Sequence, residues 1–186
     1  LLSWFQVFGF QDVASLGNPK YTFSGKPALD AFEYLHGLEE SGCAWLSRLP
    51  DPEYYFATRQ ALFYSAGLSH HSKLADAMAW NESEDGWTMI PFPSGKGKPI
   101  ILSSGISLAI LSGDSRQQMA AWLFALWIRQ PENLSRLAKA AGMWPASTQA
   151  IQHMADYKAD HPQWAESLLW IPIAQAKAME SFGDVV

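Results

Sequence analysis

Residues 103–145, SSGISLAILSGDSRQQMAAWLFALWIRQPENLSRLAKAAGMWP, carry the pattern that decides the fold. A small-residue turn and an apolar run come first, and Asp114 or Ser115 can then cap a helix. Pro131 begins a second helix, and Gly142 ends it, because glycine adopts the left-handed backbone at a helix end most easily. The stretch therefore predicts turn, strand, helix, helix and loop in that order, and it holds no plausible set of catalytic side chains.

The first of these helices has an apolar face. Met119, Trp122, Leu123, Leu126 and Trp127 follow one another at helical spacing. A stripe of this kind is typical of a helix that packs on a core. We therefore expect the two tryptophans, like most of the nine in the chain, to be packed rather than exposed.

Outside this stretch, helical patterns alternate with short apolar runs. Helices are expected at residues 27–41, after Ser69, at 147–158 and at 162–169. Residues 61–64 and 87–92 favour short strands, and apolar runs at 100–102 and 108–111 flank the turn at 103–105. Strands mixed with helices predict an α/β lobe in which helices cover a small mixed sheet. No internal repeat or low-complexity linker divides residues 1–186, so we expect one domain.

The bulk composition excludes several classes of function. A chain with 48% hydrophobic residues can bury a core, and a net charge of -5 without a basic run argues against a nucleic-acid partner. The apolar stretches, such as residues 120–128, are much shorter than the about 20 residues that a membrane span needs. The single Cys43 has no disulfide partner within the chain. Because Leu1 is not Met and the last residues still look helical, we expect an incomplete piece of a longer protein.

The histidines do not form a pattern typical of a metal site. His70 and His71 are adjacent, so on a helix they point in different directions, and a surface or capping role is expected for both. His36, His153 and His161 are scattered and belong to no ligand motif such as His-Glu-x-x-His. Neither a metal nor another cofactor is expected.

Two short motifs resemble catalytic or phosphate-binding elements only superficially. Ser65 lacks the nucleophile elbow Gly-x-Ser-x-Gly, because Phe63 occupies the first glycine position. Residues 95–98, GKGK, lack the spacing with which a phosphate loop wraps its backbone amides around phosphate. The acidic pair Glu39 and Glu40 lies at a helix end and suits a solvated surface. The sequence therefore predicts a protein that binds rather than an enzyme.

Aromatic faces are the feature that favours a sugar as the ligand. Tryptophan can pack on the apolar face of a sugar ring while nearby hydroxyls and amides bind its rim. Trp4 and Trp144 have the surroundings of greatest interest. Trp144 lies between the helix-ending Gly142 and Pro145, and both packing and ligand contact stay open for it.

Several blocks, taken in order, resemble the family 1 extracellular solute-binding proteins of ABC importers. The blocks are FATRQAL at 56–62, SAG at 65–67, WTMIPFP at 87–93, SGISL at 104–108, AWLF at 121–124 with QPE at 130–132, and GMWP at 142–145. The resemblance extends from about Trp4 to the end of the chain. It departs from the family pattern at Arg59 and Ser104, where glycine is common, and at Met143, where tyrosine is common.

The resemblance implies a fold and a set of ligand contacts. It implies the C-terminal lobe of a type II periplasmic-binding-protein clamp, with the N-terminal lobe and the final helices absent from residues 1–186. Ligand would lie between the lobes and be closed in by a hinge motion. The implied cleft-facing residues are small or aromatic: Trp4, Ser65, Gly67, Ser104, Gly105, Met143 and Trp144. Small residues let a ligand approach the backbone closely.

The resemblance also implies a role and partners. The whole protein would be a periplasmic or extracellular receptor, lipid-anchored through a missing N-terminal segment or free, that delivers a carbohydrate or related polar solute to a membrane permease. Two alternatives remain at this point. One is a carbohydrate-acting enzyme, which needs two carboxylates about 5 to 10 Å apart, and the other is a protein-interaction domain anchored by exposed tryptophans.

Overall fold

The computed structural model describes residues 2–10, 25–93, 99–103, 105 and 108–176. The chain divides into two compact units. Unit 1 comprises Leu1–Arg48, Ile90–Ser104 and Leu169–Val186, and unit 2 comprises Leu49–Met89 and Gly105–Leu168. The expectation of one domain over residues 1–186 stays a prediction.

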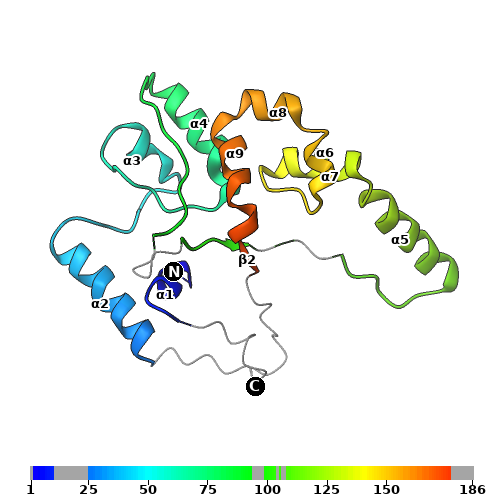
Figure 1. The fold of residues 1–186 in the computed structure, drawn as a ribbon, viewed down its shortest axis with the longest axis horizontal. Helices are drawn as coiled ribbons and strands as arrows, with labels where there is room; N and C mark the ends of the chain where they lie inside the picture. The colour runs from blue at the N-terminus through cyan, green and yellow to red at the C-terminus, as the bar shows by residue number, and fades with distance from the viewer. Residues whose placement is uncertain (1, 11–24, 94–98, 104, 106–107, 177–186) are drawn as a thin grey trace. The chain divides into compact units, whose positions relative to one another are not determined.

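Helices make up most of the described structure (Figure 1). The elements are α1 (Leu2–Val7), α2 (Lys26–Glu40), α3 (Glu53–Ala57), η2 (Leu68–His70), α4 (His71–Trp80), β1 (Leu102–Ser103), α5 (Ser115–Ile128), α6 (Pro131–Ala141), α7 (Thr148–Ile151), α8 (Ala155–Asp160), α9 (Pro162–Ser167), η3 (Leu168–Ile173) and β2 (Gln175–Ala176). The helices predicted at 27–41 and after Ser69 are confirmed as α2 and α4. Residues 147–158 form two short helices in place of one.

Unit 1 is built where α1 packs on α2. Phe5 and Phe10 bury their rings against Ala28 and Ala31, whose small side chains let the two segments approach closely. A short parallel pair, β1 with β2, joins residues 102–103 to residues 175–176. The first turn of α2 contains a proline, which has no amide hydrogen to leave unpaired there.

Unit 2 has its core where α6, α8 and α9 meet. Ala138, Met154 and Trp164 form this core, and the last two are among the largest fully buried side chains described. Partly buried side chains pack around it: Leu68, Met89, Trp144, Tyr157 and Leu168. Because Leu68 lies in η2 and Trp144 follows α6, the core ties the segment before α4 to the loop after α6.

The start of α5 and the end of α6 follow the sequence prediction. The carboxylate of Asp114 accepts hydrogen bonds from the backbone amides of Arg116 and Gln117, both at 2.9 Å, and so caps α5. Gly142 ends α6 with a left-handed φ of 63°. The amide of Met143 then donates to the carbonyl of Ala138, and the amide of Gly142 donates to that of Lys139, which satisfies two carbonyls at the helix end.

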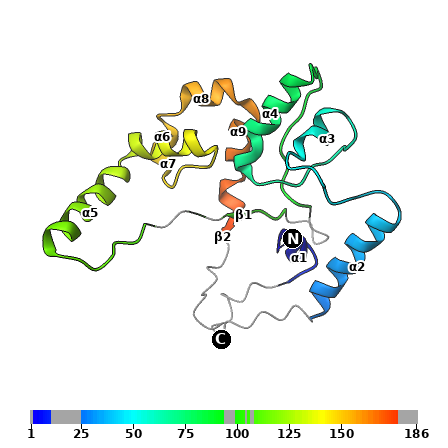
Figure 2. The same cartoon turned by 180° about the vertical axis from the view of Figure 1, so that it is seen from behind.

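The packing predicted for Trp122 and Trp127 is wrong. Their side chains are 52% and 50% exposed, and Met119, Leu123 and Leu126 are exposed as well. Within unit 2, α5 extends away from α3, α4, α8 and α9 in both views (Figures 1 and 2). Apolar residues occupy several faces of α5, so its sequence does not single out one buried side.

The predicted strands at 61–64 and 87–92 are also wrong, and residues 108–111 are not a strand. Leu62 and Phe63 are exposed loop residues, so the apolar run at 61–64 is not buried. Near residues 87–92 the described structure shows a single antiparallel bridge, between Phe92 and Ile100. Strand pairing in the described residues amounts to this bridge and the β1–β2 pair, and a larger mixed sheet stays a prediction.

No described helix is long and apolar enough to cross a membrane.

Candidate functional site

Residues 65–67 (Ser65, Ala66 and Gly67), predicted as a small-residue turn and called the SAG turn below, form an exposed irregular segment between α3 and η2. Gly67 has an extended backbone, with φ of -79° and ψ of 157°, and directly precedes η2. The amide of His70 donates to the carbonyl of Gly67 at 3.0 Å, which closes the first turn of η2. The turn therefore presents small side chains and backbone polar groups to solvent.

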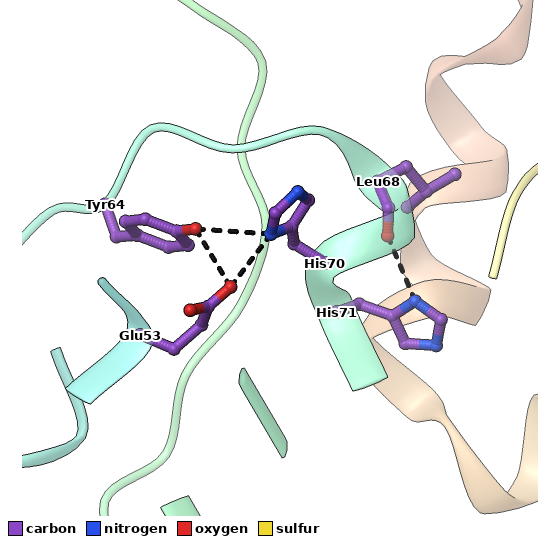
Figure 3. A network of polar contacts seen from close by, with 5 residues as sticks. All are labelled: Glu53, Tyr64, Leu68, His70 and His71. Atoms are coloured by element: carbon purple, nitrogen blue, oxygen red, sulfur yellow. Dashed lines mark hydrogen bonds and ion pairs between the residues drawn. The ribbon is translucent and has the colours of Figure 1, made fainter. Parts of the chain in front are cut away.

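Both flanks of the SAG turn bind the same carboxylate oxygen (Figure 3). The hydroxyl of Tyr64, just before the turn, donates to Oε1 of Glu53 at 3.1 Å. Nδ1 of His70, three residues after the turn, lies 2.8 Å from the same oxygen and donates to it, because a carboxylate can only accept. Glu53 is the first residue of α3, and its side chain is 4% exposed.

Burial and hydrogen bonding together set the ionisation of Glu53 and Tyr64. Burial alone would raise the pKa of Glu53, but hydrogen bonds from His70, from its own backbone amide and from Tyr64 outweigh it and lower that pKa. Burial raises the pKa of Tyr64 to about 12, and its hydrogen bond to the Glu53 carboxylate adds to the rise. Near neutral pH, Glu53 is therefore an ionised acceptor and Tyr64 a neutral donor.

His71 forms a second anchor, directly after η2. Its Nδ1 donates to the carbonyl of Leu68 at 3.0 Å, and its Nε2, left as the acceptor, lies within hydrogen-bond distance of the hydroxyls of Ser72 at 3.2 Å and Tyr157 at 3.1 Å. The residue is 3% exposed, and its ring meets that of His161 edge to face. Burial lowers the pKa of His71 first of all, and His161 lowers it further. Of the surface or capping role predicted for His71, the surface role is wrong, because the imidazole is buried in its neutral form, whereas the capping role is confirmed, because His71 is the C-cap of η2 and its side chain binds the Leu68 carbonyl.

The loop after α6 approaches this second anchor. A Cβ added to Gly142 would lie 3.0 Å from Cε1 of His71 and 3.4 Å from the carbonyl oxygen of Ser69. A side chain at residue 142 would strain the left-handed backbone and would require its neighbours to shift by a few tenths of an ångström. The segment that follows the SAG turn and the one that precedes Met143 and Trp144 are therefore neighbours in unit 2.

Trp144 is held on the core side of its loop. Its indole N–H donates to Oγ of Ser167 at 2.8 Å, and that hydroxyl donates to the carbonyl of Trp164 at 2.6 Å. The ring is half-buried against the unit 2 core, and Met143 is half-buried beside it. The indole N–H of Trp144 is thus engaged within the protein, while part of its ring remains exposed.

Three further candidates were predicted, namely Trp4, Ser104 and Gly105. Trp4 belongs to unit 1, where its ring packs edge to face on Phe92 at 5.2 Å and tilted on Tyr34 at 5.9 Å. Gly105 is exposed in unit 2. Ser104 lies outside the described residues. Of the seven predicted residues, Ser65 and Gly67 precede Ser69, and Met143 and Trp144 follow Gly142, so these four flank the close approach of Gly142 to Ser69 and His71.

Sequence reasoning missed Glu53, Tyr64 and His71 as parts of this site. Glu53 is 11 residues from Tyr64 and 17 from His70, so no local motif connects them. Placing Tyr64 in a strand obscured its role as the flank of a turn. The signal that could have helped was the pair of hydrogen-bonding residues that bracket the small turn.

The arrangement suits recognition of a polar solute through hydroxyls, backbone groups and an aromatic face. Among the described residues, no group of three or more His, Cys, Asp or Glu side chains could hold a metal ion. The buried carboxylate of Glu53 is occupied by hydrogen bonds from two side chains of its own unit.

Comparison with known proteins gives one match. A family model described as bacterial extracellular solute-binding protein matches residues 1–164. No curated protein and no solved structure matches the chain.

Proposed function

Because the chain belongs to the family of bacterial extracellular solute-binding proteins, we propose that it is the ligand-binding lobe of a receptor that delivers a carbohydrate or related polar solute to an ABC importer. The solute binds at the SAG turn and at the loop of Met143 and Trp144. In the whole protein a second lobe closes over it by a hinge motion. The family is one of receptors without enzymatic activity, so binding and release are its chemistry.

One observation supports this site most strongly, namely the close approach of Gly142 to Ser69 and His71. In support of the site, the segment that follows the SAG turn lies next to the one that precedes Met143 and Trp144, although the two are far apart in the sequence. The SAG turn offers hydroxyl and backbone groups for a sugar rim, and Trp144 offers part of a ring for a sugar face. No charged side chain belongs to the seven candidates, which suits a neutral solute.

The alternative of a protein-interaction domain has one observation in its favour, the exposed apolar surface of α5. Trp122 and Trp127 on this helix are each about half exposed, and large exposed aromatic residues often anchor protein partners. Self-association that increases with protein concentration, measured by sedimentation, would favour this function over solute binding if no solute stabilises the fold.

The solute proposal is tested by thermal unfolding of the protein in the presence of a panel of compounds. The panel contains glucose, xylose, maltose, trehalose, sorbitol and glycerol 3-phosphate. A ligand at 100 times its Kd stabilises the folded state by about 2.7 kcal/mol, which raises the melting temperature by several degrees. We expect at least one neutral sugar or polyol to do so. Unchanged melting with every member would contradict a carbohydrate receptor.

A further inference from the structure

The SAG turn is held from both sides by a single atom. Tyr64 immediately precedes the turn, His70 closes η2 after it, and both reach Oε1 of Glu53, at 3.1 and 2.8 Å. The hydroxyl of Tyr64 and Nδ1 of His70 also lie 3.4 Å from each other. The three side chains thus form a closed triangle at the base of the turn (Figure 3).

Burial makes this triangle selective for one arrangement of the turn. A carboxylate that is 4% exposed has lost most of its contact with water, so its stability depends on the hydrogen bonds that the protein supplies. If the turn moved, Tyr64 and His70 would leave, and the charge of Glu53 would be buried without those partners. The flanks of the turn are therefore fixed, while Ser65 and Gly67 between them remain exposed.

We propose that Glu53 is a positioning residue for the solute: it holds the SAG turn in its binding conformation through Tyr64 and His70 without touching the ligand. This role rests on the proposed function, since it assumes that the turn contacts solute. Glu53 acts by raising the fraction of molecules whose turn is ready to bind. When that fraction falls, the apparent affinity falls in proportion. A protein whose turn is ordered in one molecule in ten therefore binds about tenfold more weakly.

The test uses two variants and a matched control. Glu53→Gln removes the charge but keeps the shape, and Tyr64→Phe removes one hydroxyl and leaves the contact between Glu53 and His70. Asp85→Asn is the control, because Asp85 is also a carboxylate that accepts side-chain hydrogen bonds, in its case two from Arg59 and one from Ser83, and it lies in the same unit. The full chain is used throughout.

The first measurement is amide hydrogen exchange of His70 and His71 without solute, because their N–H groups donate to the carbonyls of Gly67 and Leu68 directly after the SAG turn. We expect exchange there to be about tenfold faster in Glu53→Gln, to be intermediate in Tyr64→Phe and to be unchanged in Asp85→Asn. Unchanged exchange in both test variants, with the chain folded, would overturn the proposal. This result does not depend on whether any panel compound binds.

The second measurement is stopped-flow binding of the panel compound that stabilises the wild-type protein most. Loss of the ordered turn should lower the association rate constant about tenfold in Glu53→Gln and leave the dissociation rate constant unchanged, because the bound state itself is intact. A loss that lies entirely in the dissociation rate constant, or unchanged binding despite faster exchange, would overturn the positioning role. If no compound binds the wild-type protein, the carbohydrate function fails separately, and the exchange experiment still decides whether Glu53 orders the turn.

Discussion

Arg59 holds Asp85 with two hydrogen bonds, from Nε to Oδ2 at 2.6 Å and from Nη2 to Oδ1 at 2.9 Å. It does so from a left-handed backbone, with φ of 60°, at the point where α3 ends. The amide of the next residue, Gln60, reaches back to the carbonyl of Tyr55, as in helix ends that usually carry glycine. Glycine adopts this backbone without strain, which is a physical reason for the glycine that the resemblance implies at this position.

Replacing Arg59 with glycine separates the effect of backbone strain on stability from that of the ion pair. Glycine adopts the left-handed conformation without strain, and the ion pair that is lost is exposed and screened by solvent. We expect Arg59→Gly to raise the urea midpoint of unfolding, whereas Arg59→Ala, which loses the ion pair and keeps the strain, should lower it. Equal midpoints for the two variants would show that the backbone at residue 59 is not strained.

Gly142 is expected to be intolerant of any side chain. Alanine would adopt a left-handed φ at a cost of about 1–2 kcal/mol, and its Cβ would meet the ring of His71 at 3.0 Å. Gly142→Ala should therefore lower the free energy of unfolding by at least this amount in urea titrations. Gly37→Ala is the control, since Gly37 lies inside α2 with no atom within 4 Å of an added Cβ, and it should stabilise by about 0.5–1 kcal/mol.

Truncation should cost far more stability at Trp164 than at Trp122. Trp164 is fully buried in the unit 2 core, so Trp164→Ala leaves a cavity and should cost about 3–5 kcal/mol. Trp122 is half exposed on α5, and Trp122→Ala should change the free energy of unfolding by less than about 1 kcal/mol. Chemical denaturation followed by circular dichroism measures both, and a larger loss for Trp122 would contradict the exposure of α5.

His71 should make stability depend on pH near neutrality. Burial holds its pKa in the folded state below the ordinary value of 6.5, with His161 adding to the effect. Between the two pKa values the unfolded chain binds more protons, so stability rises with pH. The contribution of His71 is full above pH 6.5 and is lost as the pH falls through the folded pKa. Unfolding titrations from pH 7.5 to 5.0 should show this decline and a shallower one in His71→Gln; parallel declines would exclude His71 as the source.

The helices were predictable because their signals are local. Asp114, Pro131 and Gly142 each act within one turn of the backbone that they cap, begin or end. The strand prediction at 61–64 failed because hydrophobicity shows that a run is apolar but not that a partner strand exists. The prediction that Trp122 is packed failed for a similar reason, since the surroundings of α5 depend on tertiary packing.

Part of the candidate site could be proposed from the sequence. The resemblance implied the SAG turn and the loop of Met143 and Trp144 as ligand contacts, but it carried no information on what holds them. The contacts of Glu53 with Tyr64 and His70, and the contact of His71 with Tyr157, 86 residues away, arise only when the chain folds. Buried polar networks of this kind leave no periodic signal in a sequence.

The most direct test of solute binding at the SAG turn is the calorimetric affinity of Gly67→Ala for the panel compound that binds the wild-type protein. A Cβ added to Gly67 meets nothing within 4 Å except Oγ of Ser69 at 3.8 Å, and the backbone there is extended, so the fold should be unaffected. Gly86→Ala, with open space around its Cβ and no place in the candidate set, is the control. We predict that Gly67→Ala binds about tenfold or more weakly, as one lost or blocked contact of about 1.4 kcal/mol requires, with unchanged melting temperature. Wild-type affinity in Gly67→Ala would contradict binding at this turn.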